Sequence, residues 1–255
     1  MKALLAVLVL TSVPGVAKMM TKPIPYEVEK VHLEGVLVYD DASPPRPGLV
    51  LVPNWMGVSE ANVRQAELVA QRGYVVFVAD LFGTQARPKS TEQASKLAQA
   101  LKADRPLMRK RAQAALAVLK SQKDAKLDPK RLGAIGFCFG GTGALELARS
   151  GAPLAGVVTF HAGLSSPTPG DAKNITGKVL ALHGADDPFV PPEEVQAFET
   201  EMRQAKVDWQ LVSFGNAVHS FTDPDANTPG KTQYNEKVAR RAYQLMDSLF
   251  AEAFQ

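Results

Sequence analysis

Apolar and polar residues alternate in the first part of the chain. Residues 26–40 read YEVEKVHLEGVLVYD, and Val28, Lys30, Val36 and Val38 mark a repeat of two. Successive side chains of a strand point to opposite faces, so this repeat is typical of strands with one exposed face. The segment therefore predicts a half-exposed antiparallel hairpin.

The apolar runs become continuous further along the chain. GLVLVPN (48–54) and YVVFVAD (74–80) have the composition of strands buried on both faces of a parallel sheet. Further strands are expected up to Gly136 and in AGVVTF (155–160), KVLALHG (178–184) and DWQLVSF (208–214). The Pro-rich stretch ASPPRPG (42–48) predicts a turn between strands.

Helical spacing of apolar residues fills the intervals between these strands. Ser59 is the expected N-cap of a first helix, which Gly73 closes, and two helices follow around 90–103 and 105–122. Other helices are expected up to Arg149, around Phe198 and at the C-terminus. Alternating strands and helices predict an α/β fold, in which an antiparallel N-terminal hairpin leads into a doubly wound, mostly parallel sheet. We expect one domain over residues 18–255.

Residues 1–17 have the pattern of a secretory signal peptide. Lys2 precedes a short apolar stretch, and Pro14 and the small residues Gly15 and Ala17 follow it. The stretch is shorter than the roughly 20 residues that span a bilayer. We expect cleavage after Ala17 and a periplasmic or secreted protein without stable membrane insertion. A retained membrane tether or a misassigned start codon, with a cytoplasmic protein, remains the alternative.

Composition adds few constraints. Charged residues make up 22% of the chain and the net charge is only +3, as in an ordinary globular enzyme. The densest basic cluster, Arg109-Lys110-Arg111, falls in a helical pattern and is interpreted as a solvated helix face rather than a nucleic-acid surface. A single cysteine excludes an internal disulfide. No His, Cys and Asp spacing suggests a metal site.

That single cysteine lies in the sequence Gly136-Phe137-Cys138-Phe139-Gly140, where a strand is expected to become a helix. A nucleophile on a sharp strand-to-helix turn has unfavourable φ and ψ, and glycine at both flanking positions removes the resulting collisions. The helix beginning at Phe139 would favour thiolate over thiol. The alternative is an inert cysteine that lines a cavity.

An acid follows the next-to-last expected strand. LALHGADDPFVPP enters a turn at Asp186-Asp187-Pro188, and acids before proline are also common in ordinary turns. We prefer Asp187 as the orienting acid because it lies four residues after His183 in an H-G-x-x-D pattern. Asp186 is expected to cap or solvate the turn.

A histidine follows the last expected strand, in FGNAVHSFTDP. His32, His161 and His183 precede the acid, and only His219 comes after it. The order nucleophile, acid, histidine is that of the α/β-hydrolase triad, so His219 is the candidate general base.

Acyl transfer also requires donors for the developing oxyanion. The backbone N–H groups of Phe139 and Trp55 are the candidates, because they follow the nucleophile and the strand LVLVPN. The Trp55 and Met56 side chains alternatively line the pocket or fill the core. Asn54, Met56, His161 and Phe221 are the expected pocket residues.

These motifs together resemble the dienelactone hydrolase family, from about residue 26 to 252. The segments that carry the resemblance are LVPNWMGVSEANVRQAELVAQRGYVVFVADLF, IGFCFGG, HGADDPFVP and AVHSFTDP. The resemblance implies a Cys138–His219–Asp187 triad, an oxyanion hole from the Trp55 and Phe139 amides, and hydrolysis of an ester or lactone.

Two positions depart from the family pattern. Well-studied members have a glutamate in place of Asn54, which takes part in activating the cysteine. They also have an arginine shortly after the histidine that binds a substrate carboxylate, where this chain has Asp223 in Ser220-Phe221-Thr222-Asp223. We therefore expect a resting Cys138–His219 pair and a preference for neutral esters.

The sequence thus predicts a monomeric, cofactor-free hydrolase of small esters, thioesters or lactones that forms an acyl-enzyme through Cys138. An acyltransferase or peptidase with the same triad is one alternative. A non-catalytic scaffold that binds a ligand or partner is the other.

Overall fold

The computed structural model describes residues 18–41 and 44–255, and its centre is an eight-stranded sheet in the order β1-β2-β4-β3-β5-β6-β7-β8. The strands are β1 (Met19–Val28), β2 (Val31–Asp40), β3 (Arg46–Val52), β4 (Val75–Val78), β5 (Leu127–Phe137), β6 (Gly156–Phe160), β7 (Lys178–Gly184) and β8 (Trp209–Phe214). Strand β2 is antiparallel to β1 and β4, and the other pairs are parallel. The predicted α/β fold with an antiparallel N-terminal hairpin is confirmed.

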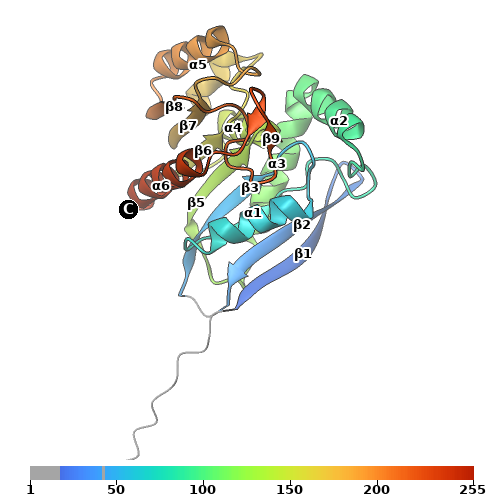
Figure 1. Cartoon of the computed structure of the whole chain (residues 1–255). Coiled ribbons are helices and arrows are strands. Elements are labelled where there is room, and N and C mark those ends of the chain that lie inside the picture. The colour runs from blue at the N-terminus through green and yellow to red at the C-terminus, as the bar shows by residue number, and fades with distance from the viewer. Residues whose placement is uncertain (1–17, 42–43) are drawn as a thin grey trace, which may run out of the picture.

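Helices cover both faces of this sheet (Figure 1). They are α1 (Glu60–Ala70), α2 (Thr91–Ala103), α3 (Arg105–Lys120), α4 (Phe139–Arg149), α5 (Pro192–Ala205), α6 (Glu236–Ala253) and the 3₁₀ helix η1 (Pro169–Asn174). Helices α1 and α6 share one apolar core with the sheet, and α2, α3 and α4 pack in the core of the opposite face. Ser59 caps α1 as predicted, because its side chain accepts the N–H of Asn62.

The expectation of a half-exposed hairpin holds for β1 and is wrong for β2. Strand β1 alternates between half-buried and exposed positions, whereas residues 36–39 of β2 are all buried. Strand β4 pairs with β2 and continues the sheet beyond it. Val36 and Val38 then pack in the core with α1, while Leu37 and Tyr39 pack in the opposite core. Both faces of β2 are therefore buried, and its repeat of two in the sequence does not mark an exposed face.

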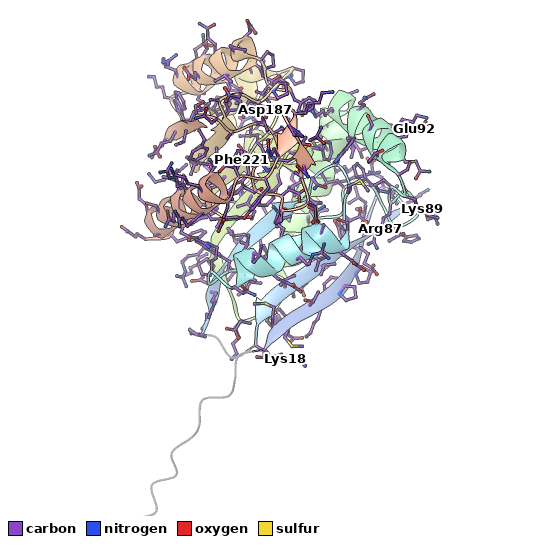
Figure 2. All side chains as sticks on the ribbon, viewed as in Figure 1. Lys18, Arg87, Lys89, Glu92, Asp187 and Phe221 are labelled. Atoms are coloured by element: carbon purple, nitrogen blue, oxygen red, sulfur yellow. The ribbon has the colours of Figure 1, made fainter. Side chains whose placement is uncertain are left out.

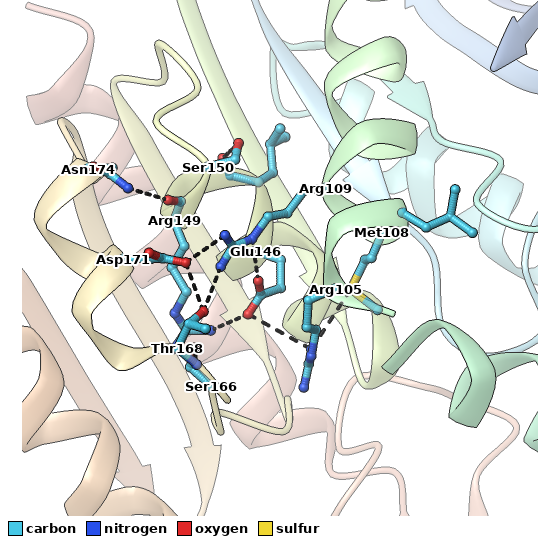
Figure 3. A network of polar contacts seen from close by, with 12 residues as sticks. Arg105, Met108, Arg109, Glu146, Arg149, Ser150, Ser166, Thr168, Asp171 and Asn174 are labelled. Atoms are coloured by element: carbon cyan, nitrogen blue, oxygen red, sulfur yellow. Dashed lines mark hydrogen bonds and ion pairs between the residues drawn. The ribbon is translucent and has the colours of Figure 1, made fainter. Parts of the chain in front are cut away.

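Helix α4 is buried along its whole length, including two charged side chains. The Arg149 guanidinium makes two hydrogen bonds to the Glu201 carboxylate, at 2.8 and 2.7 Å, and a third to Glu146 at 3.1 Å. Arg109 links the same Glu146 to Asp171 through two bonds of 2.7 Å (Figure 3). This charged network joins α3, α4, α5 and η1.

The basic cluster on α3 is not a solvated face, as the sequence pattern had suggested. Only Lys110 is exposed, and it pairs with Glu29. Arg109 belongs to the charged network, and the Arg111 guanidinium is buried and donates to the carbonyl of Leu81 at 2.5 Å. Long arginine stems can lie along apolar surface while the guanidinium finds acceptors, and a helical pattern of charges does not reveal this.

Two predicted segments lie wholly or partly outside the described residues. The expected signal peptide, residues 1–17, lies outside the described residues, as do residues 42–43 of the expected turn. Strand β3 already begins at Arg46, so the Pro-rich stretch is partly strand. Among the described residues, no helix is both long enough and apolar enough to cross a membrane.

Candidate active site

Cys138 occupies the sharp turn between β5 and α4, with a left-handed φ of +56°. A Cβ on Gly136 would lie 2.1 Å from the carbonyl oxygen of Gly140, and one on Gly140 would lie 2.0 Å from that of Val52. Gly136 is therefore required by the backbone within the turn, and Gly140 by the backbone at the end of β3. The N–H of Cys138 donates to the Phe160 carbonyl of β6 at 3.0 Å, which fixes the strained residue to the sheet.

The structure brings Asp187 and His219 to the same edge of the sheet as Cys138. Asp187 follows β7 and His219 follows β8, and His219 Nδ1 lies 2.7 Å from Asp187 Oδ2. Asp187 and Phe221 lie far from Lys18, where the described chain begins (Figure 2). The second Asp187 oxygen accepts the N–H of Phe189 at 2.9 Å. Asp186 is exposed, so Asp187 is the acid that meets the histidine.

The three side chains form a charged, hydrogen-bonded series. Burial opposes protonation of His219, but its bonds to Asp187 and Cys138 and their negative charges raise its pKa to about 10. Burial likewise opposes the thiolate of Cys138. The hydrogen bond and charge of His219, helped by the Phe139 N–H, outweigh burial and lower the pKa of the thiol. Both shifts favour a thiolate–imidazolium pair over a neutral thiol and a neutral imidazole.

One candidate oxyanion donor follows Cys138 directly in the chain, and the other belongs to Trp55, which lines the same cavity as Cys138. The Phe139 N–H interacts with Cys138 itself. The Trp55 N–H donates to no acceptor within residues 18–41 and 44–255. Its neighbour Asn54 turns the chain, because Asn54 Oδ1 accepts the N–H of Met56 at 3.0 Å and the Asn62 side chain at 2.9 Å. These bonds fix the turn that carries Trp55.

A cavity of about 400 Å³ opens beside Cys138. Asn54, Trp55 and His161 line it, as the sequence had suggested for Asn54 and His161. Met56 and Phe221 are not among its lining residues. Phe221 is fully buried and packs against the ring of His161, with ring centroids 5.0 Å apart.

Two walls of this cavity escaped the sequence analysis. One is the polar face of α1, with Arg64, Gln65, Glu67, Leu68 and Gln71, and the other is the loop from Ser220 to Asp225. Leu68 is 52% exposed on an otherwise polar helix face. A single apolar residue on a polar helix face is common on protein surfaces, so the sequence held no distinctive signal for this wall.

Phe189 was also missed. Its ring lies edge-on to the His219 imidazole, with centroids 5.3 Å apart, although 55% of Phe189 is exposed. It lies directly after the proline of the Asp-Pro turn, and an aromatic residue at that place carries no distinctive pattern. For metals, the described ranges contain no group of three His, Cys, Asp or Glu side chains that could hold an ion.

Known proteins resemble this chain over most of its length. The dienelactone hydrolase family model matches residues 33–254. An uncharacterized protein of Caenorhabditis elegans is 34% identical over 152 residues, covering 58% of this chain and 94% of its own. A carboxymethylenebutenolidase homolog of Xenopus tropicalis is 25% identical over 198 residues, covering 76% of this chain and 78% of its own.

Solved structures agree. A dienelactone hydrolase-like promiscuous phosphotriesterase from metagenomic libraries superposes with a TM-score of 0.87 and 41% identity, covering 93% of this chain and 99% of the other. A dienelactone hydrolase from Anabaena variabilis has the same fold, with a TM-score of 0.68 and 21% identity over 93% of this chain and 99% of its own. The fold, the family model and these relatives together show that the chain belongs to the dienelactone hydrolase family and is a hydrolase.

Proposed function

We propose that the protein hydrolyses small, uncharged esters, thioesters or lactones through a thioester intermediate on Cys138. The observation that carries the proposal is the series Asp187–His219–Cys138, with a 2.7 Å bond between the first two residues and, at the strained turn, a cysteine whose pKa His219 lowers. A thiolate is the reactive form of cysteine, and the positive imidazole beside it is ready to donate a proton.

Acylation begins when the Cys138 thiolate attacks the carbonyl carbon of the substrate. As the C–S bond forms, negative charge moves to the carbonyl oxygen, which the N–H groups of Trp55 and Phe139 would stabilise. The tetrahedral intermediate then expels the alcohol oxygen, and His219 gives that oxygen its proton. The product is an acyl-cysteine, a free alcohol and a neutral His219.

Deacylation uses the same groups in reverse. Neutral His219 accepts a proton from water while the water oxygen attacks the thioester carbon, and the same N–H groups receive the second oxyanion. Expulsion of the Cys138 thiolate gives the acid and restores the charged pair. Asp187 stays ionised and orients the imidazole through Nδ1 in both steps.

The volume and the acidic lining of the cavity favour small substrates that carry no carboxylate. Its volume of about 400 Å³ is at the lower end for a small-molecule site. Glu67, Asp223 and Asp225 lie on its walls, and Arg64, its basic lining residue, is 4.0 Å from Asp225. An anionic lactone would therefore meet repulsion along both walls.

Rapid mixing with 4-nitrophenyl butyrate followed by intact-protein mass spectrometry tests the proposal. We expect a butyryl adduct on Cys138 in the wild type, sustained release of butyrate, and neither in Cys138→Ala. One acylation without turnover would favour the non-catalytic scaffold. Acylation of an added alcohol or amine in place of water would favour acyl transfer.

A phosphotriesterase activity is a second candidate, because the relative that is 41% identical carries that name. A phosphotriester is uncharged, as the cavity favours, and the thiolate could displace an aryloxide from phosphorus while His219 protonates the leaving oxygen. A neutral aryl dialkyl phosphotriester should then phosphorylate Cys138 and be turned over. Inactivation after one equivalent of aryl alcohol would contradict this second candidate.

A further inference from the structure

His161 has a backbone conformation that the proposed chemistry does not by itself explain. Its φ is +41° at the end of β6, and the residue is only 3% exposed. Left-handed backbone is unfavourable for a bulky residue and persists where surrounding structure enforces it, often at functional sites. Here the His161 N–H donates to the Leu182 carbonyl of β7 at 2.8 Å, so the sheet holds the strained residue in place.

The ring of His161 lies against the catalytic histidine. The two imidazoles meet edge to face, with centroids 5.1 Å apart and planes at 63°. Phe189 makes a similar contact with His219 at 5.3 Å and 83°. Two neighbouring rings therefore restrict the His219 ring, in addition to its hydrogen bonds.

His161 is itself fixed by polar and aromatic contacts. Its Nε2 lies 2.8 Å from Thr222 Oγ1, three residues after His219 along the chain. Phe221 packs edge-on against the His161 ring at 5.0 Å and an interplanar angle of 87°. Thr222 is in turn contacted by Gln65 of α1 at 3.5 Å. Because the His161 ring is fixed, it can restrict the orientation of the His219 ring that packs against it.

The need for this contact differs between the two half-reactions of the proposed function. In the resting enzyme, His219 is held at both ring nitrogens, by Asp187 and by the Cys138 thiolate. Once the sulfur is acylated, its negative charge is gone and that second hydrogen bond is weakened. Only Asp187 and the packed rings then keep His219 directed at the water that must attack.

We infer that His161 is a positioning residue for deacylation: its ring keeps His219 oriented while Cys138 is acylated. The inference rests on the proposed function, because it requires the thioester intermediate. His161 need not touch the substrate in this role. Loss of its ring should slow deacylation much more than acylation.

The test measures both steps with 4-nitrophenyl butyrate in the wild type, His161→Asn and His161→Phe. The first burst of nitrophenolate gives the acylation rate, and the steady-state phase gives deacylation. Asparagine tolerates the left-handed backbone but lacks a ring. Phenylalanine keeps a ring and loses the bond to Thr222. Phe214→Leu is the control, because Phe214 packs against Phe221, one layer away from His219.

In His161→Asn we expect deacylation to slow about tenfold or more, since a small misplacement of a catalytic group has effects of this order. Acylation should change less than about threefold. The butyryl adduct should accumulate, and iodoacetamide should alkylate the resting cysteine with the pH profile of the wild type. His161→Phe should restore most of the deacylation rate, and Phe214→Leu should leave the ratio of the two rates unchanged.

Equal slowing of both steps in His161→Asn, a shifted alkylation profile, or no recovery in His161→Phe would each overturn the inference. The same experiment keeps the proposed function separate. A wild type that forms no adduct on Cys138 contradicts the thioester mechanism itself. A wild type with a normal adduct and an unchanged ratio in His161→Asn contradicts only the role of His161.

Discussion

Helix α4 has ionisable groups at both ends, and the two sets are arranged differently. Near its C-terminus, Arg149 and Glu146 are fully buried and bonded to Glu201, Arg109 and each other. At its N-terminus, Cys138 interacts with His219 and lines a cavity. The network at the C-terminal end has fixed protein partners, whereas the sulfur keeps one side free for a substrate.

The comparison indicates that the C-terminal end of α4 contributes to stability and the N-terminal end to reactivity. A buried charge that loses its partner is costly, so the network can hold α4 in place only while all its members remain. An active site gains from a nucleophile that is strained and incompletely satisfied. We expect substitutions at the two ends to have separable effects on folding and on hydrolysis.

The largest effect should follow Cys138→Ala. Loss of the nucleophile should lower hydrolysis of an activated ester at least about 10⁴-fold, leaving only binding and the oxyanion donors. The thermal unfolding midpoint should stay equal or rise, because active-site groups are often held at the expense of stability. Residual activity above about a tenth of wild type would contradict the role of Cys138. A large fall in the midpoint would contradict the separation of the two ends.

Arg149→Met tests the other end. Removing this guanidinium leaves the Glu201 carboxylate without its buried partner and leaves Glu146 bonded to Arg109, so the free energy of unfolding should fall by about 3–5 kcal/mol. Hydrolysis per folded molecule should change little. Chemical denaturation measures the first quantity, and active-site titration before kinetics measures the second.

Arg203→Met is the matched control, because Arg203 lies on α5 in an exposed pair with Glu199 at 3.8 Å. Exposed pairs contribute little, so its denaturation curve should match that of the wild type. Equal stability losses in both variants would show that the buried network has no special role.

Asp187→Asn should have an intermediate effect. Without the carboxylate, His219 loses the charge that stabilises its protonated form, but cysteine remains an intrinsically strong nucleophile, so activity should fall about 10²-fold. Asp186→Asn changes a neighbouring exposed carboxylate and should stay within about twofold of wild type. The reverse order of the two effects would mean that Asp186 is the orienting acid.

The smallest effect concerns the charge of the resting pair. Thiolate forms as pH rises through the lowered pKa of Cys138, so iodoacetamide alkylation should level off well below the ordinary thiol value of about 8.5. The protonated partner persists until the pH approaches the His219 pKa of about 10. A profile centred near the free-thiol value would contradict the resting pair.

Asn54→Glu sharpens this measurement. A carboxylate beside the sulfur disfavours thiolate, so the alkylation profile should move about one pH unit upward. Asn54→Gln keeps the neutral amide and should leave the profile in place. An unchanged profile in Asn54→Glu would mean that the side chain at this position does not face the sulfur.

The sheet and the grouping of Cys138, Asp187 and His219 could be predicted because their signals are local. Continuous apolar runs mark buried parallel strands, and the Gly-x-Cys-x-Gly spacing marks the sharp turn after β5, although the backbone that excludes a Cβ at Gly140 belongs to Val52 and Pro53. Chain order then separated His219 from the other histidines. Asp187 could be chosen from its place in the turn that follows a predicted strand.

The remaining features depend on contacts between distant segments. Burial of both faces of β2 depends on its pairing with β4, some forty residues away. The charged network draws on four elements, so Arg149 by itself looks like any basic residue at the end of a helix. The polar face of α1 lines the cavity only because the loop after His219 folds opposite it.

The missing side chain of Gly140 has a consequence for how this enzyme can change. A Cβ at this position would lie 2.0 Å from the carbonyl oxygen of Val52 and 2.4 Å from that of Pro53, so α4 and the chain just before Trp55 touch backbone to backbone. Their spacing therefore does not depend on which side chains line the cavity. Libraries randomised at Leu68 or Asp223 can alter substrate range on an unchanged catalytic frame, whereas Gly140 should accept no other residue. Adaptation to new esters is thus expected to proceed through α1 and the loop that carries His219.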